Sequence, residues 1–208
     1  MTNNNCNEKL MYKGKKYKYP NNVQTMAGYE PSKYSIQKSR ILIVGTRPSL
    51  KGKERNFYYM APQNRLYDWL EQAQVQLGYK NTVIAKYKKS KSLNIDKLKD
   101  SIYESGIVLF DTIKDCVCTG SEDDTTICYN LHTLNEFKKI FNNSNIKLII
   151  FTSEQAREYF VNEIDINGEY SHLLCSEDPI SPSGNRRTNR EEAIEQWKNA
   201  LAKGIEND

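Results

Sequence analysis

Short runs of consecutive apolar residues recur along this chain, separated by segments with the 3.6-residue period of an amphipathic helix. Three of the runs suit buried strands: Ile41–Val44, Ile107–Phe110 and Ile146–Phe151. A fourth candidate strand is His172–Cys175. The helix-period segments cover about 64–77, 95–105, 133–142, 153–162 and 189–203. Because strands that alternate with helices build a sheet covered on both faces, the pattern predicts a three-layer α/β/α sandwich with a mostly parallel four-stranded sheet.

The first part of the chain lacks this pattern. Residues 1–38 are polar, rich in Asn, Lys and Tyr, and show no clear period, so we expect a basic N-terminal arm. Residues 39–208 are then one domain, which is consistent with a total length of 208 residues.

The charge balance permits a polyanionic partner without requiring one. The formal net charge is +4, and the basic residues gather in two clusters, at 12–19 among tyrosines and at 86–91. Such clusters are either ordinary solvated surface or an electrostatic footprint on phosphates. The sequence contains no apolar stretch of the length of a membrane span or a signal peptide, so a soluble cytoplasmic protein is expected. The five cysteines are expected to be reduced thiols.

Three long loops follow strands, at 45–64, 111–130 and 176–188. Ligands of such sheets bind at the carboxyl ends of the strands, where these loops would meet. Gly45 ends the first strand and would let a ligand approach the backbone closely. The aromatic residues 57–59 could stack a planar base, or pack on the sheet edge. The last loop, Ser181–Arg187, combines hydroxyls with two arginines, which suits a phosphate.

Taken in order, these segments resemble the uracil-DNA glycosylase superfamily, and within it the hypoxanthine-DNA-glycosylase-like and mismatch-specific branches. The first motif is ILIVGTRPS followed by YYMAPQNRLYDWL, and the middle segment is GIVLFDTIKDCVCTGSED. The next strand and its continuation are KLIIFTSEQA, and the last motif is SPSGNRRTNREEAIEQW. Several agreements in register over roughly 39–203 are more specific than any single one.

The resemblance implies a base pocket and a DNA-binding surface. Thr46 and Arg47 hold the positions that face the base or the attacking water, and Tyr59 holds that of the aromatic residue that stacks on the flipped base. The base-binding residues that it implies are Gly45, Tyr59, Asn64, Ser121 and Ser181. The DNA-binding residues that it implies are Pro48, Ser49, Ser183, Gly184, Asn185, Arg186 and Arg187, with Asn185 as the wedge that fills the hole left in the duplex.

The chain also departs from the family pattern. Arg47 stands where many members carry Asp or Asn to orient water, and Thr152-Ser153 and Cys118 differ from the hypoxanthine-type branch. A rebuilt pocket is therefore expected. Acidic residues crowd the middle loop: Asp111, Asp115, Glu122, Asp123 and Asp124. Asp123 or Asp124 is the expected catalytic carboxylate, because such a group can stabilise a cationic sugar or position water; the alternative is that these acids cap a turn.

The expected function is that of a monofunctional DNA glycosylase, which flips a damaged, deaminated or modified base out of DNA and hydrolyses its N-glycosidic bond with water. It would act on DNA as a monomer without a cofactor. No metal is expected, because Cys116, Cys118, Cys128 and His132 lack a standard ligand spacing. The alternatives are a non-catalytic DNA-binding or inhibitory relative, and a glycosylase directed at hypermodified bases, for example in phage DNA.

Overall fold

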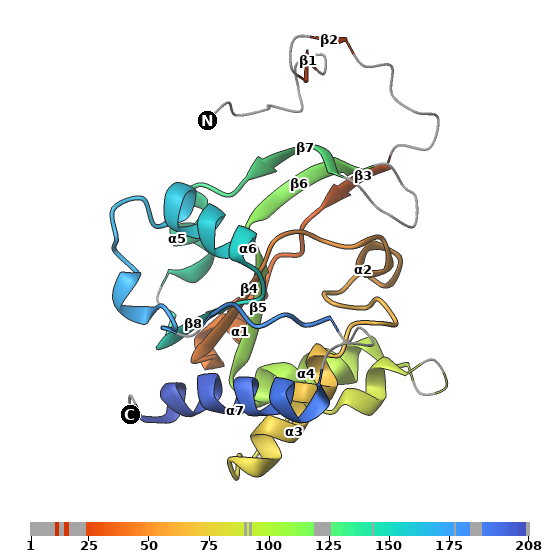
Figure 1. Cartoon of the computed structure of the whole chain (residues 1–208), viewed down its shortest axis with the longest axis vertical. Helices are drawn as coiled ribbons and strands as arrows, with labels where there is room; N and C mark the ends of the chain where they lie inside the picture. Colours follow the sequence, from red (N-terminus) through yellow and green to blue (C-terminus); the bar gives the residue numbers. More distant parts are fainter. Residues whose placement is uncertain are drawn as a thin grey trace.

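The structure is a computed structural model, and it describes residues 11–12, 15–16, 24–89, 91, 93–118, 126–142, 144–176, 178–183 and 189–206. A parallel sheet lies at the centre of the fold (Figure 1). Its middle strand, β4 (Ile41–Gly45), pairs with β5 (Ile107–Asp111) on one side and with β8 (Leu148–Phe151) on the other. All three strands are buried along their length, as their continuous apolar sequences predict.

The prediction of a fourth strand in this sheet is wrong. Residues Ser171–Leu173 form a 3₁₀ turn, η3, and Leu174 makes an isolated parallel bridge to Ile149. The chain beyond it follows the β8 edge through widely spaced backbone hydrogen bonds, from Cys175 N to Ile149 O at 2.8 Å and from Ile180 N to Phe151 O at 2.9 Å. A short apolar run next to exposed His172 is too brief for a continuous ladder, so the parallel sheet has three strands.

Helices pack on both faces of the parallel sheet. Because side chains alternate along a strand, Ile41 and Ile43 face one core while Leu42 and Val44 face the other. The first core is completed by α3 (Leu66–Gln76), α4 (Ile95–Glu104) and α7 (Arg190–Glu206). The second is completed by α1 (Lys33–Lys38), α5 (Leu134–Phe141), α6 (Glu154–Tyr159) and the π-helical turn η2 (Phe160–Ile164).

A second, antiparallel sheet replaces much of the expected middle loop. It consists of β3 (Gln24–Ala27), β6 (Ile113–Cys118) and β7 (Thr126–Leu131), in the order β3-β6-β7. The interpretation of 111–130 as a loop is therefore wrong over β6 and β7. Polar residues such as Lys114 and Asp115 interrupt the apolar pattern of β6, so this strand could not be recognised from the sequence. The short elements are β1 (Met11–Tyr12), β2 (Lys15–Lys16), α2 (Leu50–Arg55) and η1 (Ala85–Lys88).

The stretch expected to be an arm contains described structure, since β3 and α1 both lie before residue 39. Residues 1–10, 13–14 and 17–23, which hold most of the lysine–tyrosine cluster, lie outside the described residues.

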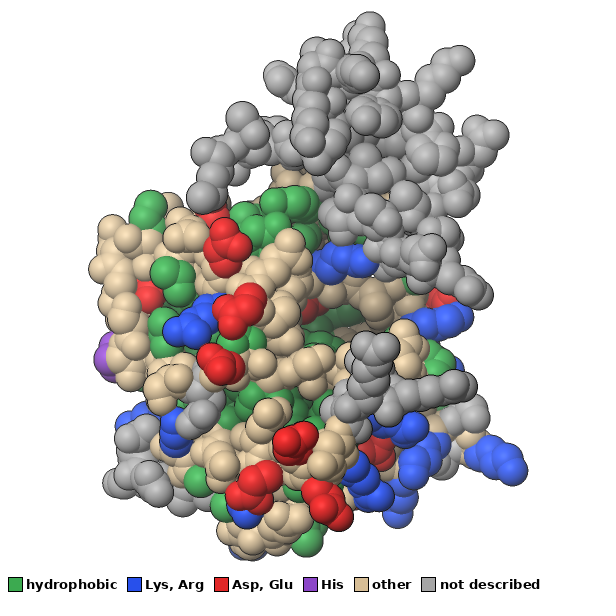
Figure 2. Space-filling view, viewed as in Figure 1, with side chains coloured by type: hydrophobic (Ala, Val, Ile, Leu, Met, Phe, Trp, Pro, Cys, Tyr) green, Lys and Arg blue, Asp and Glu red, His purple; other side chains and the backbone are tan. Residues whose placement is uncertain are grey.

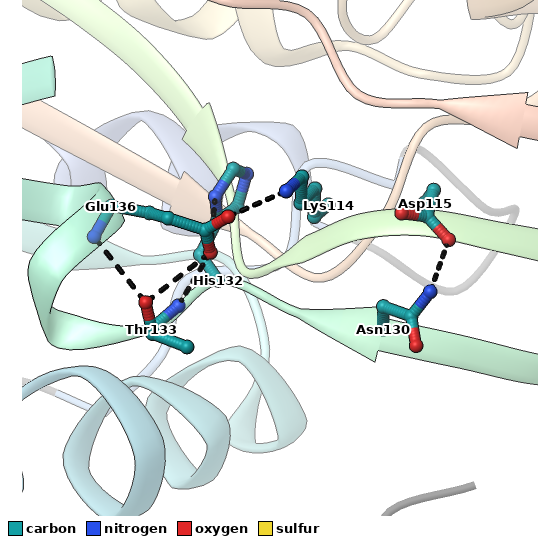
Figure 3. Close-up of polar contacts among 6 residues, drawn as sticks. All are labelled: Lys114, Asp115, Asn130, His132, Thr133 and Glu136. Atoms are coloured by element: carbon teal, nitrogen blue, oxygen red, sulfur yellow. Dashed lines mark hydrogen bonds and ion pairs between the residues drawn. The ribbon is translucent and has the colours of Figure 1, made fainter. Parts of the chain in front are cut away.

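A polar network joins the antiparallel sheet to α5 (Figure 3). Thr133 and Glu136 form a reciprocal capping box at the start of α5, and Lys114 of β6 forms an ion pair with Glu136. His132 lies buried beside this pair, with its Nδ1 3.8 Å from Glu136 Oε2. Burial lowers the pKa of His132, although the Glu136 carboxylate opposes the shift.

This environment predicts a loss of stability in mild acid. A histidine kept neutral in the fold takes up its proton more readily in the unfolded chain, so stability should fall as the pH drops below the ordinary imidazole pKa of about 6.5. Thermal unfolding followed across this pH range should show the fall, and His132→Phe should reduce it. The same pH dependence in His132→Phe would show that other groups cause it.

Candidate active site

Polar groups gather where the three parallel strands end. Gly45, Asp111 and Thr152 lie at or just after the carboxyl ends of β4, β5 and β8. Backbone hydrogen bonds fix this edge, from Thr112 N to Gly45 O at 2.9 Å and from Thr152 N to Val44 O at 2.9 Å. The strand ends of a parallel sheet are the usual place for a ligand, so this edge is the candidate site.

Gly45 is the point around which the site is packed. A Cβ atom at this position would lie 2.4 Å from Asp111 Oδ1 and 2.4 Å from the Tyr59 hydroxyl, so no larger residue fits without movement. The carboxylate and the phenol therefore approach the same face of the β4 backbone. The sequence predicts a close approach to the Gly45 backbone, and in the structure the side chains of Asp111 and Tyr59 make this approach.

Tyr59 is held in an unusual backbone conformation. Its φ angle is +51°, in the left-handed region, which costs a bulky residue about 1–3 kcal/mol unless its surroundings enforce it. The preceding residue is fixed at both ends, because the Tyr58 hydroxyl donates to Tyr29 O and the Tyr67 hydroxyl donates to Tyr58 O at 2.7 Å. The Tyr59 hydroxyl lies 3.3 Å from Thr152 Oγ1. These contacts direct the half-buried Tyr59 to the strand-end edge.

Asp111 is the buried carboxylate of the site, with 4% of its surface exposed. Burial raises the pKa of Asp111 to about 7, and the positive charge of Arg47 acts against the shift. The pKa of Tyr59 is also raised, chiefly by burial and then by the Asp111 charge. A carboxyl group that changes charge near neutral pH inside a site is a common mark of function.

Asp111 is one of the acidic residues that crowd the middle segment of the sequence, but it is not among the site residues predicted above. The available signal was its place directly after the apolar run of β5, at the edge where ligands bind. The acids that were favoured instead, Asp123 and Asp124, lie outside the described residues, as does Ser121.

Thr46 and Arg47 continue from β4 into the site. Thr46 Oγ1 and Ser153 Oγ lie 2.8 Å apart and share a hydrogen bond between the ends of β4 and β8. Half-buried Arg47 donates from Nη1 to Pro48 O at 3.1 Å and contacts Cys118 Sγ at 3.8 Å. The guanidinium thus lies between the first loop and the end of β6.

The first and last loops of the sequence motifs meet in the structure. Asn64 and Ser183 form an antiparallel bridge, and Arg65 N donates to Pro182 O at 2.8 Å. Asn64 Oδ1 accepts from Leu66 N at 3.0 Å at the start of α3, and Ser181 Oγ accepts from Ser183 N at 3.2 Å. These side chains therefore shape the loops.

Two other residues of the DNA-binding prediction also have structural contacts. Ser49 caps α2 by accepting from Gly52 N at 3.0 Å, and Pro48 is buried. The remaining members of that prediction, Gly184, Asn185, Arg186 and Arg187, lie outside the described residues.

Two of the middle cysteines, Cys116 and Cys118, lie next to each other on β6. Cys116 and Cys118 are buried with their Sγ atoms 3.5 Å apart. Among the described residues, no group of three or more His, Cys, Asp or Glu side chains is arranged to hold a metal ion. Nor does any described helix have the length and apolar character needed to cross a membrane.

The fold and this edge define an α/β domain with a polar site at the carboxyl ends of its parallel strands. Its fold is similar to the solution NMR structure of a "putative Uracil DNA glycosylase" from Methanosarcina acetivorans, with a TM-score of 0.58 and 20% sequence identity. That likeness covers 86% of this chain and 99% of the other. A sequence model of the uracil DNA glycosylase superfamily matches residues 31–202, and the chain belongs to this superfamily. No curated protein matches the chain.

Proposed function

We propose that this protein is a monofunctional DNA glycosylase that flips a damaged, deaminated or modified base into the site at the ends of β4, β5 and β8. The observation that carries the proposal is the meeting of Asp111, Tyr59 and Gly45 at that edge. It combines an aromatic ring, on which a flipped base can stack, with a buried carboxylate, which can stabilise a cationic sugar.

The proposed chemistry assigns a separate task to each group. The base leaves the duplex and stacks on Tyr59, while Thr46 and Ser153 offer hydroxyls to its edge. Cleavage of the N-glycosidic bond places positive charge on the sugar, and the Asp111 carboxylate stabilises that charge and positions the attacking water. Arg47 favours the ionised form of Asp111, which gives a reason for its presence where many relatives carry Asp or Asn. Asp123 or Asp124 is the second candidate for the carboxylate.

The protein would act as a monomer and without a cofactor, and no lysine corresponds to a Schiff-base nucleophile in the motifs, so no strand cleavage is expected. Within the superfamily, we place the protein closest to the hypoxanthine-DNA-glycosylase-like and mismatch-specific branches. The direct test is an abasic-site assay on duplexes that carry uracil, hypoxanthine and other modified bases. Alkali-labile sites at one type of base, without cleavage before alkali, are expected; cleavage before alkali would contradict the monofunctional mechanism.

A second candidate function is DNA binding without catalysis. Arg47 favours it, because this residue already donates to Pro48 O and contacts Cys118, so that its side chain is partly committed to structure and has no acceptor with which to orient water. Tight binding of modified duplexes with no abasic product from any of them would support this alternative over the enzyme. A product restricted to bulky or hypermodified bases would point to defence against foreign DNA.

A further inference from the structure

A cationic pocket lies beside the candidate active site. It has a volume of about 300 Å³ and is lined by Arg55, Met60, Pro62, Asn64, Arg65, Asp68, Ala85, Lys88 and Lys89. Four of these side chains carry a positive charge and one carries a negative charge. Figure 2 shows Lys and Arg side chains gathered in the lower right part of the face in view, where Figure 1 places α4 and the chain that leads into it.

Lys88 is the member that distinguishes this pocket from a solvated patch. Its Nζ donates to Asn64 O at 2.5 Å and lies 5.7 Å from the centre of the Tyr67 ring. The pKa of Lys88 is lowered to about 8, chiefly by burial; the Asp68 carboxylate opposes the shift, and the positive charges of Arg65 and Arg55 add to it. Keeping the Lys88 ammonium group charged beside the two guanidinium groups of Arg55 and Arg65 therefore costs free energy. A bound anion would remove that cost.

Asp68 is the one acidic residue of the lining and offsets part of this positive charge. Its Oδ2 lies 3.5 Å from Arg65 Nη1, at the edge of hydrogen-bonding distance, and both side chains are partly exposed. The pocket therefore keeps an excess of positive charge that favours an oxyanion.

The position of the pocket connects it to the loops of the site. Met60 follows Tyr59 directly, and Asn64 pairs with Ser183 of the last loop. A strand whose base entered the strand-end site would pass over this segment, and its backbone carries one phosphate for each nucleotide. Neither the DNA-binding residues predicted from the sequence nor the superfamily match assigns a role to Arg55 or Lys88.

We propose that this pocket, formed by Arg55, Arg65, Lys88 and Lys89, binds a phosphate oxyanion, and that its source is the backbone of the DNA strand next to the flipped nucleotide. The proposal rests on the proposed function for the identity of the strand. The chemistry of the pocket, a phosphate group held by several cations, does not depend on base excision.

The test measures binding and not excision. The double variant Arg55→Gln/Lys88→Gln removes two charges, while glutamine keeps a donor for Asn64 O. Fluorescence anisotropy with an unmodified duplex should show affinity reduced by roughly tenfold, similarly for all sequences, and a plot of log affinity against log salt whose slope is smaller by about 1. The matched control is Lys33→Gln/Lys139→Gln, which removes the same charge from exposed positions on α1 and α5 and should leave the slope unchanged.

Two results would overturn the assignment of the pocket to DNA. The first is wild-type affinity and slope in Arg55→Gln/Lys88→Gln, with thermal unfolding showing that the variant is folded. The second is calorimetric binding of inorganic tripolyphosphate that the double variant loses while its DNA binding is unchanged, which would identify a free phosphate compound as the source. Suppose that the double variant loses DNA affinity as expected, but that the wild-type protein excises no base. This result would support the pocket and contradict the proposed enzyme, so the two claims can fail separately.

Discussion

Asp111→Asn is expected to slow single-turnover base excision by at least about 100-fold, the usual lower range for a positioned acid–base group. The buried carboxylate lies against Gly45 and near the Tyr59 hydroxyl, and asparagine keeps its shape without its charge. The excision rate of the wild-type protein should also rise with pH through about 7, because the proposed mechanism uses the ionised form of Asp111. The variant should lose this dependence.

The same substitution should make the fold more stable in weak alkali. The folded pKa of Asp111 is raised above the value of about 3.9 in an unfolded chain, so the stability that depends on it is complete below that value and is lost as the pH rises through about 7. Asparagine carries no charge to bury, and the thermal midpoint at about pH 8 should therefore rise. Asp115→Asn is the matched control, because Asp115 accepts a hydrogen bond from Asn130 at 2.7 Å on the antiparallel sheet. A wild-type excision rate in Asp111→Asn would assign catalysis to another group. Asp123 and Asp124 would then be the next candidates.

Tyr59→Ala is expected to reduce single-turnover excision by about 10- to 100-fold. Stacking of a base on an aromatic ring contributes about 1–3 kcal/mol, and about 1.4 kcal/mol corresponds to a tenfold change in rate. Tyr59→Phe should lose much less, because it keeps the ring and gives up the contact of the hydroxyl with Thr152.

A purely structural role for Tyr59 would give a different result. In that case Tyr59→Ala would lower the thermal midpoint while the folded fraction excised bases at the wild-type rate. Tyr34→Ala is a suitable control, because Tyr34 is 58% exposed on α1, away from the strand ends. A folded Tyr59→Ala protein with normal excision would place the base elsewhere in the site.

The parallel strands were predictable because they are buried on both sides. β4, β5 and β8 are continuous apolar runs, and such runs need no tertiary information to be recognised. The antiparallel strands β6 and β7 carry Lys114, Asp115 and Asn130, whose polar side chains are satisfied by partners distant in sequence. Their pattern is that of a loop until the pairing between the strands is known.

The site shows the same division between local and distant information. The loops and their order were visible in the sequence, and so was Gly45 at the end of a strand. The convergence of Asp111 and Tyr59 on Gly45 was not visible, because it depends on strand pairing and on a positive φ angle at Tyr59, next to a Tyr58 that hydrogen bonds with Tyr29 and Tyr67 hold in place. Sequence therefore pointed to the more conspicuous acids of the middle segment.

Release of a base from DNA with water at the strand-end site is the activity proposed for this protein. Mass spectrometry of the free bases released from DNA rich in modified bases tests it most directly, because the method requires no prior choice of substrate. One class of intact free base and an equal amount of abasic sites are expected from the wild-type protein, with little of either from Asp111→Asn. No free base from any DNA, or equal release by wild type and Asp111→Asn, would contradict it.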